Sequence, residues 1–125
     1  MSTAWKFSVP GQPPSVNHSY RVIRLRRKDG STYQRLGKIS KVADYQEMVA
    51  YLARAARPSS WEPEGLIRVR YWMFVKRDID CDNVLKAIND GLKWALDIDD
   101  KRFLPCVVDK TTKVAEPHVE IEVIG

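Results

Sequence analysis

Apolar and polar residues alternate in three stretches of the chain, which is the pattern of half-buried β-strands. The stretches run from Trp5 to Val9, from Leu66 to Val75 and from Val119 to Val123. The second is the longest, and we expect it to be the central strand of a sheet. One of its faces carries only apolar side chains, namely Ile67, Val69, Tyr71, Met73 and Val75.

A spacing of three and four between apolar residues predicts two amphipathic helices. The first covers Lys41 to Ala56, with Ser40 placed to cap its N-terminus. The second runs from about Asn83 to Leu96, with Asp82 available as its N-cap. Its inward residues would be Leu85, Ile88, Leu92 and Ala95.

Two further strands flank a turn signal near the start of the chain. Tyr20–Arg26 and Thr32–Leu36 enclose Lys28-Asp29-Gly30, which predicts a hairpin in which the glycine supplies the positive φ. With another strand near Cys106–Lys113, the elements predict an α+β fold: one mixed sheet of about five to six strands packed against two helices. The length of 125 residues suits a single domain, residues 1–125.

Composition excludes several classes of protein. With 44% hydrophobic and 30% charged residues, the chain can bury a core and is not a disordered tail. It has no apolar run of about 18 residues and no secretion signal at its start, so we expect a cytoplasmic protein without a membrane partner. The two cysteines, Cys81 and Cys106, lack the spacing of a zinc cluster and are too few for a disulfide framework.

The charge distribution favours a polyanionic partner. The chain has 21 Lys and Arg against 16 Asp and Glu, a net charge of +5. Eight basic residues and one acid lie between Tyr20 and Lys41, and a second basic set begins at Arg68. We expect nucleic-acid contacts from Arg21, Arg24, Arg26, Arg27, Lys28, Arg68, Arg70 and Lys76. The alternative is a solvated hairpin whose charges only aid solubility.

Between Asp78 and Asp100 the sign of the charge reverses, because seven of the sixteen acids lie there and all are aspartates. In an extended segment the side chains of Asp80 and Asp82 project to the same side and could reach one cation. Asp82, Lys86 and Asp90 follow at helical spacing. A third acidic group, Asp97 to Asp100, follows the second helix.

Clustered carboxylates of this kind suit Mg²⁺, which prefers carboxylate oxygens and water and leaves positions for a substrate phosphate. Such a site could cleave a phosphodiester, with Lys86 neutralising developing charge or orienting the water. The other interpretation is structural: an Asp between a strand and a helix often only caps the helix, and an Asp-Lys-Asp ladder is often a solvated face.

These residues together resemble a known family. The pattern Asp80-x-Asp82-Asn83-x-x-Lys86-x-x-x-Asp90, followed by Asp99-Asp100 and Lys110, is similar to that of the RusA family of Holliday-junction resolvases, which is common in phages and prophages. The segment Pro13-Pro14-Ser15-x-Asn17 is similar to the family's opening motif.

The resemblance implies a homodimeric, Mg²⁺-dependent endonuclease that resolves four-way junctions by paired symmetric nicks in DNA recombination and repair. Mn²⁺ could replace Mg²⁺, and no small-molecule cofactor is expected. Asp80, Asp82 and Asp100 match the catalytic metal ligands, and Lys86 matches a functional lysine.

The resemblance also places Asn17 in a loop near the substrate, with a turn-forming asparagine as the equal alternative. Lys110 completes the expected DNA-binding residues. The spacing to the Asp pair is slightly shorter than in the family, so either Asp99 or Asp100 could be the third ligand. Asp78 and Asp97 are additional acids. The alternative function is a non-catalytic protein that binds branched DNA or RNA and whose Asp cluster is structural.

Overall fold

A four-stranded mixed sheet forms the centre of the computed structural model, which describes residues 3–14, 20–38 and 40–125. The strand order is β1-β6-β4-β5, with bounds β1 (Ala4–Pro10), β4 (Ile67–Phe74), β5 (Phe103–Thr111) and β6 (His118–Ile124). Strand β6 pairs antiparallel with β1 and with β4, whereas β4 and β5 are parallel. The predicted α+β class with a mixed sheet is confirmed.

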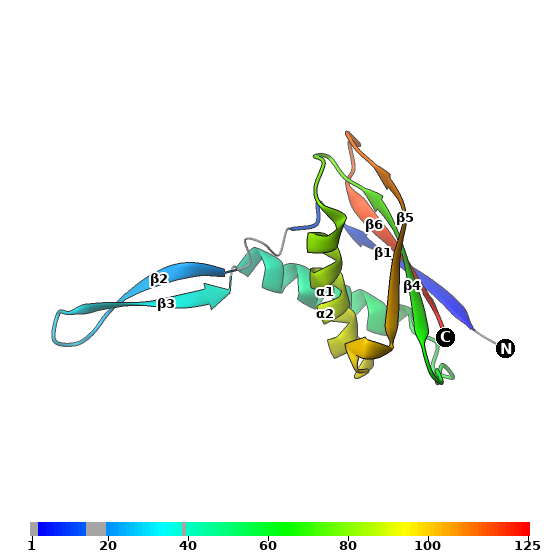
Figure 1. Ribbon diagram of the computed structural model, residues 1–125, viewed down its shortest axis with the longest axis horizontal. Coiled ribbons are helices and arrows are strands. Elements are labelled where there is room, and N and C mark those ends of the chain that lie inside the picture. Colours follow the sequence, from blue (N-terminus) through cyan, green and yellow to red (C-terminus); the bar gives the residue numbers. More distant parts are fainter. Residues whose placement is uncertain (1–2, 15–19, 39) are drawn as a thin grey trace.

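The expected five to six strands in this sheet were too many, because the hairpin does not join it. Strands β2 (Tyr20–Arg26) and β3 (Thr32–Lys38) form a separate two-stranded sheet, which extends away from the rest of the molecule (Figure 1). The predicted turn is confirmed: Gly30 has a φ of 91°, and the Arg27 amide donates to the Ser31 carbonyl at 2.8 Å. This local turn fixes the pairing of the two strands without a third strand.

Two helices, α1 (Ser40–Ala56) and α2 (Cys81–Leu96), cover the same face of the sheet (Figure 1). They cross closely at Gly91, where a Cβ atom would lie 2.8 Å from the Gln46 carbonyl oxygen. Helix α2 starts earlier than predicted, because its N-cap is Asp80 and not Asp82: the Asp80 carboxylate accepts from the Asp82 amide at 3.1 Å. Neither helix combines the length and hydropathy that crossing a bilayer would require within the described part of the chain.

The core lies between the helices and the inner face of β4. The predicted inner residues of this strand are confirmed as buried: Ile67, Val69, Tyr71, Met73 and the following Val75. Helix α2 contributes Val84, Ala87, Ile88, Leu92 and Leu96. Leu85 and Ala95, which were expected to point inward, are half-buried, because the inward stripe of this helix lies partly one residue away from the predicted positions.

Strand β5 contains a bulge. Tyr71 pairs with Val107, but the next residue, Trp72, pairs with Asp109, so Val108 is an extra residue in β5. Val107 packs partly against the core, and Lys110 lies opposite the buried Met73. After the bulge, Lys110 therefore lies on the side of the sheet that carries the helices.

Candidate active site

Two of the predicted catalytic carboxylates line one pocket between α2 and β5. Asp82 lies in the first turn of α2, and Asp100 begins the short 3-10 helix η2 (Asp100–Arg102) that precedes β5. The pocket has a volume of about 380 Å³, and its lining residues are Asp82, Leu85, Lys86, Asn89, Asp90, Asp100, Phe103 and Pro105. The structure thus brings together Lys86 and three acids that are spread over 19 positions of the sequence.

Asp80 is oriented differently. It lines a neighbouring pocket with Asp78, Ile79, Cys81 and Lys110. One of its carboxylate oxygens accepts the hydrogen bond that caps α2. Asp80 therefore has the capping role that the structural interpretation gives to an Asp between a strand and a helix. Cys81, between the two, is half-buried against the core.

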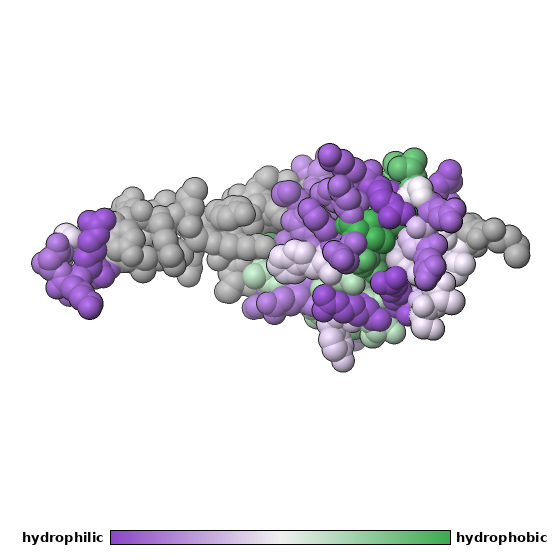
Figure 2. Space-filling model, turned by 90° about the horizontal axis from the view of Figure 1, so that it is seen from below, coloured by the Kyte–Doolittle hydropathy of each residue, from purple (hydrophilic) through white to green (hydrophobic). Residues whose placement is uncertain are grey.

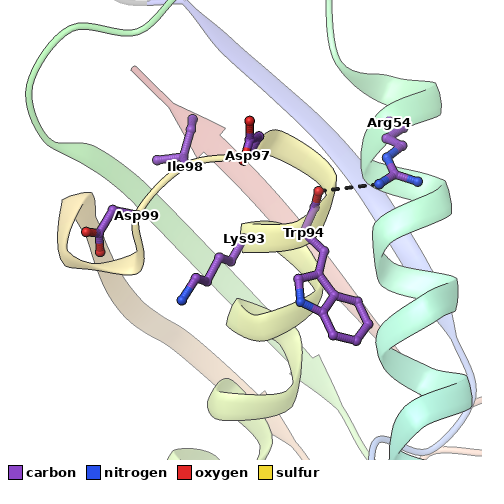
Figure 3. Close-up of a pocket in the computed structure, with 6 residues that line it drawn as sticks. All are labelled: Arg54, Lys93, Trp94, Asp97, Ile98 and Asp99. Carbon is purple, nitrogen blue, oxygen red and sulfur yellow. Dashed lines mark hydrogen bonds between the residues drawn. The ribbon is translucent and has the colours of Figure 1, made fainter.

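The two candidates for the third ligand face different pockets. Asp99 is the N-cap of η2, and its Oδ1 accepts from the Lys101 amide at 3.0 Å, which holds the pKa of Asp99 below its usual value. It lines a pocket together with Arg54, Lys93, Trp94, Asp97 and Ile98 (Figure 3). Asp100 is the member of the pair that shares a pocket with Asp82.

The loop that leads from β4 into α2 is held from two remote parts of the chain. The Gln12 amide makes two hydrogen bonds with it: Oε1 accepts from the Lys76 amide at 2.7 Å, and Nε2 donates to the Arg77 carbonyl at 3.2 Å. From β5, the Lys110 ammonium lies 2.6 Å from an Asp78 carboxylate oxygen and donates to the Ile79 carbonyl at 3.3 Å. The contact lowers the pKa of Asp78 and raises that of Lys110.

Two polar residues of the pocket are themselves held by buried groups. The hydroxyl of Tyr71, a core residue of β4, donates to Asn89 Oδ1, and burial raises the pKa of this hydroxyl, so that it stays protonated. The buried Gln46 of α1 donates to Asp90 at 3.4 Å. We did not predict Asn89 from the sequence, although its position seven residues after Asp82, two helical turns on, places it on the same helix face.

The predicted DNA-binding residues do not form one surface with this pocket in the part that the structure describes. Arg26, Arg27 and Lys28 are exposed at the hydrophilic tip of the hairpin (Figure 2). Arg68 and Arg70 alternate with the buried residues of β4 and so lie on the sheet face without helices, where Arg70 pairs with Glu122 at 3.8 Å. Lys76 is exposed in the loop after β4. Asn17 and the side chains of Arg21 and Arg24 lie outside the described residues.

The donor set of the pocket fits a hard divalent cation. No three His, Cys, Asp or Glu side chains within the described residues are placed to hold one ion together. Mg²⁺, however, is usually bound through one or two carboxylates, with waters and substrate phosphate as its other ligands. Asp82 and Asp100 supply two exposed carboxylates in one pocket, which meets that requirement.

Comparison with known proteins adds one finding. The family model described as Endodeoxyribonuclease RusA matches residues 10–124, nearly the whole chain and all of the pocket. No curated protein matches the chain significantly.

Proposed function

The chain belongs to the RusA endodeoxyribonuclease family, and from this premise we propose that it is a Mg²⁺-dependent endonuclease that resolves Holliday junctions and other branched DNA. In this proposal the protein makes paired, symmetric nicks during DNA recombination and repair. The single observation that carries the proposal is the shared pocket of Asp82, Asp100 and Lys86.

Asp82 and Asp100 would hold the ion, and Asp80 would add negative charge beside them. When bound, Mg²⁺ would supply Lewis-acid activation of water and neutralisation of the phosphate; Mn²⁺ would serve in its place. Two hydrogen-bond donors of the pocket act on the phosphate as well. Lys86 lies four residues after Asp82 in α2, a backbone rise of about 6 Å, and its ammonium stabilises negative charge on the phosphate. The amide NH₂ of Asn89 donates to a phosphate oxygen, because Tyr71 occupies the carbonyl side of that amide.

The basic residues would bind the arms of the DNA. The hairpin extends away from the main sheet (Figure 1), so Arg26, Arg27 and Lys28 at its exposed tip would contact phosphates away from the pocket. The proposed set is completed by Arg21, Arg24, Arg68, Arg70, Lys76, Lys110 and Asn17. Replacing Arg24, Arg26 and Arg27 with Ala would then lower the salt dependence of binding, by about 0.9 in log–log slope for each lost phosphate contact. An unchanged slope would argue for a hairpin whose charges are only solvated.

Two opposed cuts require two active sites, and one chain supplies one, so we propose a two-fold symmetric homodimer. Exposed apolar residues on the edge strand β5, Leu104 and Val108 at 43% and 49% exposure, support a partner contact. Sedimentation at micromolar concentration should show a dimer; a monomer that still makes paired nicks would contradict this part of the proposal.

The alternative, a non-catalytic protein that binds branched DNA or RNA, is favoured by the capping roles of Asp80 and Asp99. A four-way junction, labelled on each strand in turn and incubated with Mg²⁺ or EDTA, separates the two functions. The proposed nuclease should nick two opposed strands only with Mg²⁺, and Asp82→Asn should bind the junction without cutting it. Binding without cleavage over a range of sequences and salt concentrations would instead establish the alternative.

A further inference from the structure

A second pocket lies at the C-terminal end of α2. Its lining residues are Arg54, Lys93, Trp94, Asp97, Ile98 and Asp99 (Figure 3). Trp94 is 54% exposed, and Arg54 reaches across from α1 to donate to the Trp94 carbonyl at 3.3 Å. An exposed tryptophan that shares a pocket with an arginine and a lysine is typical of a binding surface.

This pocket continues the candidate active site along the same helix. Lys86, Asp90 and Lys93 recur at intervals of four and three residues, so they share one face of α2, and Asp97 follows as the C-cap of the helix. From Asp90 to Trp94 the rise along the helix is about 6 Å. On the other wall, the adjacent residues Asp99 and Asp100 line the second pocket and the candidate active site respectively.

We propose that the Trp94 pocket is a nucleotide subsite, in which an unpaired base of the DNA stacks on the Trp94 indole. This inference rests on the proposed function, because the unpaired base in the proposal is one that the bound nuclease displaces next to the phosphate that is cut. Lys93 and Arg54 contact the flanking phosphates; a guanidinium has five N–H donors, so Arg54 can do this while it holds the Trp94 carbonyl. An aromatic ring combined with cations is the usual means of binding unpaired nucleotides.

The two acids of the pocket are compatible with a base. The carboxylate of Asp99 already accepts the Lys101 amide. Asp97 ends α2 in a left-handed conformation, with φ 52°, and supplies an acceptor for the exocyclic amino group of a base. A phosphate alone would be repelled by these carboxylates, so the subsite suits a whole nucleotide better than an isolated anion.

The test measures binding in EDTA, where no cleavage occurs, with a four-way junction that carries 2-aminopurine at the branch point and with an unbranched duplex of the same length. The variants are Trp94→Ala, the conservative Trp94→Phe, and Tyr51→Ala as a matched control, because Tyr51 is an exposed aromatic residue, at 72%, that lines neither pocket. Thermal melting checks that each variant is folded.

Loss of one stacked base should weaken junction binding by Trp94→Ala about 10-fold, while duplex binding changes less than about twofold. The wild type and Trp94→Phe should alter the 2-aminopurine fluorescence, and Trp94→Ala should not. The control should behave as the wild type.

Equal junction affinity and equal fluorescence for the wild type and Trp94→Ala would overturn the subsite, whatever the cleavage result. Equal weakening on junction and duplex, together with a shift from dimer to monomer, would also overturn it and assign the surface to a second copy of the chain. A wild type that shows the Trp94 effect but never cleaves with Mg²⁺ would overturn the nuclease function and leave the subsite supported.

Discussion

The segments on either side of α2 use the same local device. At the start of the helix, Asp80 accepts the amide of Asp82, two residues ahead, and Asp82 lines the candidate active site. After the helix, Asp99 accepts the amide two residues ahead, and Asp100 faces the same pocket. In each segment one aspartate accepts a backbone amide and a following aspartate lines the pocket, so a dense run of acids divides into capping members and pocket-lining members.

The two segments differ in what holds them. The first is held by exposed contacts from distant parts of the chain, Gln12 and Lys110. The second is held by the Arg102 guanidinium, which donates to the Gly65 and Pro63 carbonyls at 2.9 and 2.8 Å, and by the buried Phe103. The comparison indicates that the second segment is the more firmly fixed.

The largest expected effect is on the cleavage rate, and it distinguishes the aspartate that lines the pocket from the one that caps η2. Asp100→Asn should lower the cleavage rate by about 10²–10³-fold, because it removes one charge from the pocket. Asp99→Asn should stay within about threefold of the wild type, because Asn also caps a helix. Cleavage rates of both variants on the same labelled junction test this. A larger loss for Asp99→Asn than for Asp100→Asn would make Asp99 the ligand.

The anchors should differ in their contribution to stability. Arg102→Ala removes two hydrogen bonds from a charged donor and should lower the free energy of unfolding by about 2–3 kcal/mol. Gln12→Ala removes neutral, exposed hydrogen bonds and should cost about 1 kcal/mol. Urea denaturation measures both. Arg102→Lys is the control, because a lysine keeps the positive charge but cannot reproduce the forked contact. Equal losses of unfolding free energy for Arg102→Ala and Gln12→Ala would contradict the comparison.

Asp80 allows its two roles to be separated. Asp80→Ala should lower the free energy of unfolding by about 1 kcal/mol, whereas Asp80→Asn keeps the cap and should cost much less. Both variants should lose cleavage, because both remove the charge. Thermal melts beside cleavage assays test this, and retained activity in Asp80→Asn would leave Asp80 with the cap alone.

The smallest effect concerns the exposed pair of Asp78 and Lys110. The hydrogen bond and charge of Lys110 hold the pKa of Asp78 below its ordinary value of 3.8. The stabilisation is therefore present at neutral pH and is lost as the pH falls through the lowered pKa. The difference in unfolding free energy between the wild type and Asp78→Asn should be small at pH 7 and shrink below about pH 4. A difference that does not change with pH would mean that the pair is not formed.

The sequence predicted best those features that depend on local repetition. The alternation along β4 predicted its buried face, and the Lys28-Asp29-Gly30 turn predicted the hairpin. It could not predict that the hairpin stands apart from the main sheet, since alternation does not reveal which strands pair. The number of strands in the sheet was overestimated for that reason.

Within the site, the clustering of aspartates was visible, but the division of their roles was not. Whether Asp80 or Asp82 caps α2 depends on the residue at which the helix begins, and helix boundaries are the least certain part of a sequence pattern. Gln12 and Tyr71 act through contacts with residues 64 and 18 positions away, and no local signal marks them. Trp94 is exposed at the second pocket, and helical spacing alone does not separate such an outer face from an inner one.

The bulge at Val108 has a consequence for the tolerance of this fold to insertions and deletions. Strand residues alternate between faces, so the extra residue reverses the side of everything that follows it. If Val108 were kept in regular alternation, it would pair with Trp72, and Lys110 would pair with Phe74 on the sheet face without helices. Deleting Val108 would instead remove the bulge and leave Lys110 opposite Met73, on the side of Asp78. A related chain that lacks the extra residue could therefore place the same lysine on the helix side with a regular strand, and alignments of related chains should be read for gaps in β5 as carefully as for substitutions.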